Sequence, residues 1–263
     1  MRWLKSWWST DQSPSNETEK NLTTKRLDLV WLRDVAFIFA FMFVLRSSIL
    51  NWYVIPTGSM LPTIKLKDHV LVNKLSYGLM LPGSGVQVIS WDEPKRGDIV
   101  LFESPMDRNT VDKSVTFVKR VIGIGGDTIS FEDGVLSING KLVREEIQDD
   151  RSELTDMGDQ SQCNSGDGKN LFIEKLNDDS SGHYILRNSR GGYTNNETKV
   201  WTVPAKQLLV VGDNRDCSND GRFWGFVDVN KIYGKAVRVF YSIDTSRGGF
   251  PAFRGDRFFT KLK

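Results

Sequence analysis

The hydrophobic positions follow two different patterns along the chain, and the change comes near residue 55. Before it, one apolar stretch dominates, LVWLRDVAFIFAFMFVLRSSILNWYVI over residues 29–55. Its uninterrupted core, Val35 to Leu45, has eleven residues, which is too short for a helix that crosses a bilayer. The 22 residues of 29–50 would instead form a helix roughly 33 Å long. We therefore predict a transmembrane anchor over residues 29–50, with a buried or surface-lying helix as the alternative.

The flanks of this stretch predict how it is oriented. Basic residues are concentrated before it rather than after it: Lys20, Lys25, Arg26 and Arg33, against Arg46 alone. Because positive charge is retained in the cytoplasm, we expect a cytoplasmic leader over residues 1–28 and the long C-terminal part outside. The leader is long and no A-x-A site follows the apolar stretch, so an anchor is favoured over a cleaved signal peptide. The C-terminal segment 253–263 mixes Phe with Arg and Lys, which predicts either a packed terminal strand or helix or a membrane-surface contact.

Beyond residue 55 the pattern has the character of β-strands. Long helical periodicity is absent, and short runs rich in β-branched and aromatic residues take its place. These runs are HVLVNK (69–74), DIVLFE (98–103), SVTFVKRVI (114–122) and KAVRVFYSI (235–243). The segment 127–143 predicts a meander, because Asp133-Gly134 and Asn139-Gly140 are typical two-residue hairpin turns. The expected fold is mainly β, an N-terminal transmembrane helix followed by an antiparallel β domain.

A polar segment interrupts this domain. Its first part, residues 144–168, carries eight acidic and two basic side chains and few hydrophobic ones. This composition predicts an inserted, largely polar β subdomain over residues 144–200, with a small sheet around 183–188. Core-like sequence then resumes, so the main β domain is expected to comprise residues 51–143 and 201–263.

The composition excludes several kinds of partner. Basic and acidic residues nearly balance, 35 against 33, so there is no electrostatic footprint for nucleic acid. The two cysteines, Cys163 and Cys217, make neither a disulfide framework nor a zinc site. There are two histidines, His69 and His183, and no His-Glu-x-x-His pattern. We expect neither a metal nor another cofactor.

The stretch PTGSMLPTI, residues 56–64, raises the question of nucleophilic chemistry. Its Gly, Ser, Thr and Pro residues are usual in solvent loops, yet they also present an isolated serine, Ser59. A serine nucleophile needs a partner that takes its proton. His69 lies in a strand-like run and His183 in the polar segment, and neither setting suggests that role.

Lys119 is the other candidate for a base. Strand alternation places it on one face with Phe117 and Val121, so that its neighbours there are apolar. Burial would disfavour the ammonium form, and lowering the pKa of Lys119 from 10.4 to about 8 requires roughly 3 kcal/mol. A surface lysine whose stem covers apolar neighbours is the alternative, and periodicity does not decide between them.

A further stretch, GDNRDCSNDGRFWG over 212–225, combines loop residues with three acids and two arginines. With it, the chain resembles the bacterial type I signal peptidases, membrane-anchored Ser/Lys endopeptidases of the preprotein secretion route. PTGSMLPT is similar to the serine box of that family, KRGDIVLF (95–102) to a strand box, FVKRVIGIGGD to the lysine box, and 212–225 to the last box. The resemblance runs from about residue 30 to the C-terminus and is weakest over 144–200.

The resemblance implies a role for each matching residue. Ser59 would be the nucleophile and Lys119, in its neutral form, the general base. The backbone N–H of Ser59 and the hydroxyl of Thr57 would form the oxyanion hole. Ser218 would orient Lys119 by a hydrogen bond. Two ion pairs would hold the last box against the lysine strand as structural support: Asp213–Arg120 and Asp220–Arg222. Shallow apolar pockets that accept alanine and reject larger side chains would lie near Ile55, Met60, Ile64 and Val118.

One residue departs from the family pattern. Cys217 stands where the family usually has asparagine, next to Ser218. A disulfide to Cys163 would perturb this loop. Cys217 as an alternative nucleophile is disfavoured, because no histidine is placed to activate it.

The function implied by the resemblance is removal of signal peptides from secretory preproteins at small-x-small sites. The enzyme would lie in the bacterial inner (plasma) membrane as a single-pass protein, with its catalytic domain on the periplasmic side. Its partners would be preproteins, the lipid bilayer and the protein-export translocon. Alternatives are a peptidase specialised for one secretion or conjugation system, and a non-catalytic membrane protein that binds signal sequences. A self-cleaving repressor would share the Ser/Lys chemistry, but the predicted anchor argues against it.

Overall fold

The computed structural model describes residues 30–43, 45–81, 87–103, 116–150, 152–154, 169–176, 182–188, 199–244 and 252–263. The chain divides into an N-terminal unit that ends at Leu45 and a larger unit that begins at Arg46. The leader predicted over residues 1–28 and Cys163, with its suggested disulfide, lie outside the described residues.

The N-terminal unit contains a helix over residues 30–43. All of its side chains except that of Val35 are exposed, including nine large apolar ones: Val30, Trp31, Leu32, Phe37, Ile38, Phe39, Phe41, Met42 and Phe43. Within the described ranges, no helix is both long enough and apolar enough to cross a membrane. Leu50, the last residue of the predicted anchor, begins the strand Leu50–Val54. From Leu50 the polar and apolar side chains alternate and the backbone pairs with a neighbouring strand.

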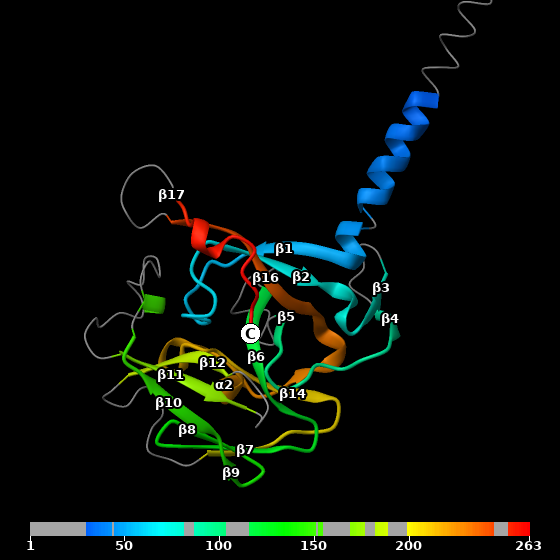
Figure 1. Cartoon of the computed structure of the whole chain (residues 1–263). Helices are drawn as coiled ribbons and strands as arrows, with labels where there is room; N and C mark the ends of the chain where they lie inside the picture. Colours follow the sequence, from blue (N-terminus) through cyan, green and yellow to red (C-terminus); the bar gives the residue numbers. More distant parts are fainter. Residues whose placement is uncertain are drawn as a thin grey trace, which may run out of the picture. The chain divides into compact units, whose positions relative to one another are not determined.

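The larger unit is built on an antiparallel sheet (Figure 1). Its strands lie in the order β1-β2-β16-β5-β6-β14-β15, and β17 pairs with β16. Their bounds are β1 (Leu50–Val54), β2 (Asp68–Asn73), β5 (Ile99–Glu103), β6 (Thr116–Ile124), β14 (Gln207–Val211), β15 (Val227–Asp228), β16 (Ile232–Asp244) and β17 (Ala252–Phe253). The four strand-like runs of the sequence correspond to β2, β5, β6 and β16, so the mainly antiparallel β prediction is confirmed.

The long strand β16 joins the two halves of this sheet. It pairs with β5 near Ile232 and with β2 from Lys235 to Ser242. Register shifts interrupt both pairings, and such bulges increase the twist of a strand, so one strand serves two differently oriented neighbours.

The predicted meander is confirmed as a second sheet in the order β13-β7-β8-β9. Its strands are β7 (Thr128–Glu132), β8 (Val135–Ile138), β9 (Lys141–Leu142) and β13 (Lys199–Thr202). Asp133 and Gly134 have φ of 49° and 80°, and Asn139 and Gly140 have φ of 53° and 78°. Two successive positive φ values are what a type I′ hairpin turn requires, and Asp-Gly and Asn-Gly tolerate them.

The polar segment forms a third sheet, called here the inserted sheet, in the order β10-β11-β12. Its strands are β10 (Arg144–Gln148), β11 (Lys169–Lys175) and β12 (His183–Asn188). It is less solvated than predicted, since Leu171 and Leu186 are buried in one apolar cluster with Leu61 of the segment between β1 and β2. The inserted sheet therefore packs against that segment (Figure 1).

Short elements complete the unit. They are the hairpin β3 (Gly78–Met80) and β4 (Gln87–Ser90), the π-helical turn η1 (Leu45–Ile49), the 3₁₀ turns η2 (Lys74–Ser76), η3 (Ser152–Leu154), η4 (Arg215–Cys217), η5 (Val229–Lys231) and η6 (Gly255–Arg257), and the helix α2 (Gly221–Trp224). The C-terminal segment packs on the main sheet, because β17 pairs with β16 and Lys261 bridges to Arg238. Phe253, Phe258 and Phe259 nevertheless remain exposed on it.

Candidate active site

Three segments far apart in the sequence meet at the candidate active site: the turn between β1 and β2 (residues 55–67, the serine turn), strand β6, and the loop after β14 (residues 212–220, the acidic loop). The topology explains why. Strand β14 runs antiparallel to β6 with Val211 opposite Arg120, so the acidic loop begins beside Lys119. Strand β5 covers the other edge of β6, with Val100 opposite Lys119.

Ser59 and Lys119 face each other across this junction. Lys119 Nζ lies 2.6 Å from Ser59 Oγ and 3.1 Å from the carbonyl oxygen of Val118. The Lys119 side chain is buried, with 4% of its surface exposed, while Ser59 is half-buried. Burial lowers the pKa of Lys119 to about 8, although the carboxylates of Asp220 and Asp213 act in the opposite direction. A substantial fraction of Lys119 is therefore neutral near physiological pH, and the neutral amine can accept a proton.

Backbone hydrogen bonds and buried side chains shape the serine turn. Ile55 N donates to Asp68 O at 3.0 Å and Lys67 N donates to Ile55 O at 2.9 Å, which closes the turn. The residues predicted to line substrate pockets, Ile55, Met60, Ile64 and Val118, are brought together in one cluster and are 0–8% exposed. In this structure they form the apolar base under the serine turn, and their role as pocket walls stays a prediction.

The other two residues predicted to act on the dyad occupy different environments. Thr57 is exposed on the serine turn. Ser218 is buried and forms no hydrogen bond to Lys119 in this structure; its side chain lies beside Asp220 instead. Ser218 nevertheless lies close to the dyad, with only Gly212 between it and Ser59. A Cβ atom at Gly212 would be 2.3 Å from Ser218 Oγ and 2.4 Å from Ser59 O, so both residues border the same small space.

Both predicted ion pairs are present in the structure. Arg120 Nε and Nη2 donate to the two oxygens of Asp213 at 2.8 and 2.7 Å, and both side chains are at most 1% exposed. Arg222 contacts Asp220 in the same bidentate way at 2.8 and 2.9 Å. Burial acts to raise the pKa of Asp213, but the charge and hydrogen bonds of Arg120, together with His183 and Thr63, outweigh it and the pKa is lowered. Asp213 is therefore a buried carboxylate that depends on Arg120.

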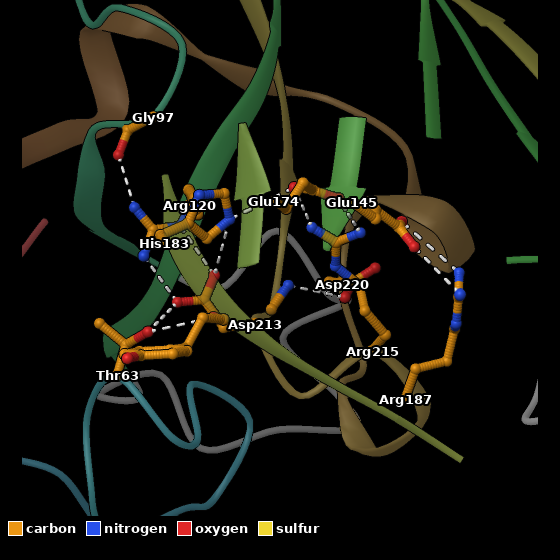
Figure 2. A network of polar contacts seen from close by, with 12 residues as sticks. Thr63, Gly97, Arg120, Glu145, Glu174, His183, Arg187, Asp213, Arg215 and Asp220 are labelled. Carbon is orange, nitrogen blue, oxygen red and sulfur yellow. Dashed lines mark hydrogen bonds and ion pairs between the residues drawn. The ribbon is translucent and has the colours of Figure 1, made fainter. Parts of the chain in front are cut away.

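Sequence reasoning missed a second set of buried charges, which comes from the inserted sheet (Figure 2). Glu174 accepts two hydrogen bonds from Arg215 of the acidic loop, at 2.8 and 2.6 Å. His183 Nε2 lies 3.3 Å from Glu174 Oε2 and 3.9 Å from Asp213 Oδ1, so it connects this pair to the Arg120–Asp213 pair. Burial and then the charge of Arg120 lower the pKa of His183. No local sequence pattern predicts these contacts.

Two further residues without predicted roles join the serine turn to the acidic loop. Thr63 Oγ1 donates to Asp213 Oδ2 at 2.5 Å. Asn214 donates from its side chain to Gly58 O at 3.0 Å and from its backbone N–H to Ser59 O at 3.1 Å. One indication of a role for Asn214 was available from the sequence, namely its place next to Asp213 in the segment 212–225 that is similar to the last box of the family.

The histidine alternative receives no support from the geometry. His69 is half-buried in β2, where its ring stacks on Tyr241 at 3.8 Å and its Nδ1 lies 3.2 Å from Lys67 O. Over the part of the chain that the structure describes, no group of three or more His, Cys, Asp or Glu side chains could hold a metal ion.

A serine and a buried lysine in hydrogen-bond contact are arranged for nucleophilic attack on a carbonyl group. Residues 29–241, well over half of the chain, match the family model described as "Signal peptidase, peptidase S26". The chain belongs to this family. A signal peptidase of family S26 is a serine endopeptidase whose substrates are preproteins that carry signal peptides.

Relatives named signal peptidase I support the assignment. The chain is 34% identical to that of Pseudomonas aeruginosa and 36% identical to that of Pseudomonas fluorescens, each over 210 residues, 76% of this chain and 67% of the relative. It is 33% identical to that of Rickettsia typhi over 244 residues, 86% of this chain and 84% of the relative. The matched region of the family model contains both Ser59 and Lys119.

Proposed function

We propose that this signal peptidase cuts preproteins after small-x-small sites with a Ser59/Lys119 dyad. The observation that carries the proposal is the 2.6 Å contact between Ser59 Oγ and the nitrogen of a buried lysine. With a pKa of about 8, roughly a tenth of Lys119 is neutral at pH 7, against less than a thousandth for an unperturbed lysine. Burial therefore allows Lys119 to act as the base, the role that a histidine has in other serine proteases.

The reaction is acyl transfer in two halves. Ser59 Oγ attacks the carbonyl carbon before the scissile bond while Lys119 Nζ takes the hydroxyl proton. When the tetrahedral intermediate collapses, Lys119 returns this proton to the leaving amine and the signal peptide stays esterified to Ser59. Neutral Lys119 then takes a proton from water, whose oxygen attacks the ester, and Ser59 recovers its hydroxyl hydrogen as the peptide leaves.

The negative charge on the substrate oxygen needs hydrogen-bond donors. We assign this role to the backbone N–H of Ser59 and the hydroxyl of Thr57, which lies two residues earlier on the same turn and is exposed to an incoming substrate. Ser218 is assigned to orient the Lys119 amine, since its buried hydroxyl is close to the dyad. Asp213, Arg120, Asp220 and Arg222 hold the surrounding backbone and do not react.

Specificity for small residues follows from the packing under the serine turn. The substrate would lie as an extended strand along the turn, over the cluster of Ile55, Met60, Ile64 and Val118. These side chains are closely packed, at most 8% exposed, and we expect the surface beside them to be shallow, so that it accepts alanine and excludes larger side chains.

A membrane location accounts for two exposed apolar surfaces. The helix over residues 30–43 exposes nine large apolar side chains, and we assign it as part of the single-pass anchor predicted over residues 29–50, in the bacterial inner membrane with a cytoplasmic N-terminus. In the larger unit, Trp52, Phe240, Phe253, Phe258 and Phe259 are 36–60% exposed and linked by ring contacts, a surface suited to the outer face of the bilayer. Ser59 follows Leu50 by nine residues, so substrates arriving from the translocon would be cut near that face. In this account residues 51–143 and 201–263 form the catalytic domain around the 144–200 insertion.

Cleavage of a preprotein tests the proposal. The full chain, solubilised in detergent, is incubated with a preprotein that carries an A-x-A site, alongside its Ser59→Ala variant. We expect the parent to release a mature protein whose N-terminus, read by mass spectrometry, follows the A-x-A site, and the variant to release none. Cleavage by the variant at the parent's rate would remove Ser59 as nucleophile. No cleavage by the parent would favour a narrower, system-specific peptidase or a binding protein.

A further inference from the structure

Asn214 contacts both peptide groups that flank Ser59. Its Nδ2 donates to Gly58 O at 3.0 Å, and its backbone N–H donates to Ser59 O at 3.1 Å. The first contact fixes the peptide between Gly58 and Ser59, and the second fixes the peptide between Ser59 and Met60. The backbone of the nucleophile is thus held from the acidic loop.

The geometry of the peptide group gives the first contact a chemical meaning. A peptide is planar and trans, so its C=O and its N–H point in opposite directions. The carbonyl of Gly58 and the N–H of Ser59 belong to one such plane, and holding the carbonyl therefore aims the N–H. That N–H is the donor assigned to the oxyanion. Leu61 N also donates to Gly58 O, at 3.2 Å, but it lies within the serine turn and moves with it.

The position of Asn214 is fixed because hydrogen bonds and ion pairs hold the residues on both sides of it. Before it, Asp213 is paired with Arg120, and its carbonyl accepts from Leu186 N at 2.9 Å. After it, Arg215 is paired with Glu174 of the inserted sheet. Asn214 itself is 1% exposed. Its amide is thus placed by two buried ion pairs and has little freedom to follow the serine turn if that turn moves.

We propose that Asn214 is a positioning residue that aims the Ser59 N–H at the substrate oxyanion. This inference rests on the proposed function, since it assigns a role within the Ser59/Lys119 reaction. Among the described residues, the amide hydrogen-bonds to the serine turn and not to Lys119, so its removal should weaken stabilisation of the tetrahedral intermediate and leave the base unchanged. Loss of a whole oxyanion donor costs about 10² to 10³ in kcat, and misaiming one costs less, about 10- to 100-fold.

The test compares Asn214→Leu, which keeps the approximate volume without hydrogen-bonding groups, and Asn214→Ala with the parent. Asn230→Leu is the matched control, since Asn230 is an exposed asparagine in the 3₁₀ turn η5, outside both the serine turn and the acidic loop. Each protein is assayed for kcat, KM and the pH midpoint on a preprotein, with thermal unfolding as a check on folding. A peptide aldehyde ending in alanine, which forms a tetrahedral adduct with a serine, and the corresponding peptide alcohol, which does not, are used as inhibitors.

We expect kcat to fall about 10- to 100-fold in both Asn214 variants, with KM within about threefold of the parent. Aldehyde affinity should fall with kcat, whereas alcohol affinity and the pH midpoint should not move, and the control should behave as the parent. Unchanged kcat, or a loss accompanied by a shifted pH midpoint or equally weakened alcohol binding, would overturn the proposal. Failure of both variants to fold would also overturn it, because the role would then be structural. A parent that cleaves no preprotein would instead refute the proposed function itself.

Discussion

Lys119 Nζ lies 2.6 Å from Ser59 Oγ, although 60 residues separate the two in sequence. The lysine reaches the serine from a strand buried on both faces, so its amine is removed from water at the point where it meets the hydroxyl. The reaction needs both the contact with Ser59 and the burial of Lys119. A lysine that contacted Ser59 but stayed exposed to water would remain an ammonium group, which cannot accept a proton.

The first prediction concerns pH. Burial lowers the pKa of Lys119 to about 8, and the base works only when neutral, so kcat/KM should rise with pH and level off above about 8. Initial rates measured from about pH 6 to about pH 10 should give one ionisation with a midpoint near 8 on the acid side. A rate that is flat down to pH 6, or a midpoint above 10, would contradict the assignment of Lys119 as a buried base.

The same burial predicts a stability effect for Lys119→Met. The pKa of Lys119 is about 8 in the folded protein and 10.5 when unperturbed, so between these values the unfolded chain binds more protons. Stability of the parent should therefore rise by about 3 kcal/mol as pH increases from below 8 to above 10.5, and the variant should lack this rise. Urea unfolding of both proteins across that range measures it. Parallel pH profiles for the two proteins would show that the lysine is not desolvated.

A third prediction concerns the Arg120–Asp213 pair. Arg120→Met leaves the Asp213 carboxylate buried without its cation, and breaking a buried pair in this way costs about 3 to 5 kcal/mol. Denaturant unfolding should show this loss. Arg144→Met is the matched control, because Arg144 is 74% exposed beside Glu146 and its removal should change the midpoint little. Equal effects of the two substitutions would mean that the buried pair contributes no more to the free energy of unfolding than an exposed arginine does.

The fourth prediction assigns the inserted sheet a part in catalysis. Glu174→Gln removes the charge that pairs with Arg215, so the acidic loop should lose its support on that side. We expect about 3 kcal/mol lower stability and about tenfold lower kcat. Glu146→Gln on the neighbouring strand β10, where Glu146 is 39% exposed, should affect neither. If Glu174→Gln retains full kcat while it loses stability, the inserted sheet supports the fold and not the reaction.

Local chemistry explains what could be predicted from the sequence. The hairpin turns at Asp133-Gly134 and Asn139-Gly140 were predictable because few residue pairs tolerate two positive φ values in succession. The burial of Lys119 was suggested by strand alternation, although alternation alone did not distinguish a buried lysine from a snorkelling one. The resemblance to a family then singled out Ser59.

Contacts between distant segments explain the rest. Glu174 and Arg215 are 41 residues apart and meet only because β11 and the acidic loop pack together, which no spacing rule encodes. The segment containing Glu174 is polar, and this composition did not indicate that Glu174 is buried and paired with Arg215. The helix prediction extended to Leu50 because apolar residues recur after Arg46, whereas pairing with β2 decides where the strand begins.

The measurement that tests the central claim most directly is preprotein cleavage by Lys119→Met compared with the parent at pH 8. Methionine keeps the length of the side chain and cannot accept a proton, and thermal unfolding confirms that the compared proteins are folded. We predict that the variant loses cleavage by about 10³-fold or more, while it still binds an alanine-ending peptide alcohol as the parent does. Cleavage by the folded variant at the parent's rate would contradict the Ser59/Lys119 mechanism and require another base.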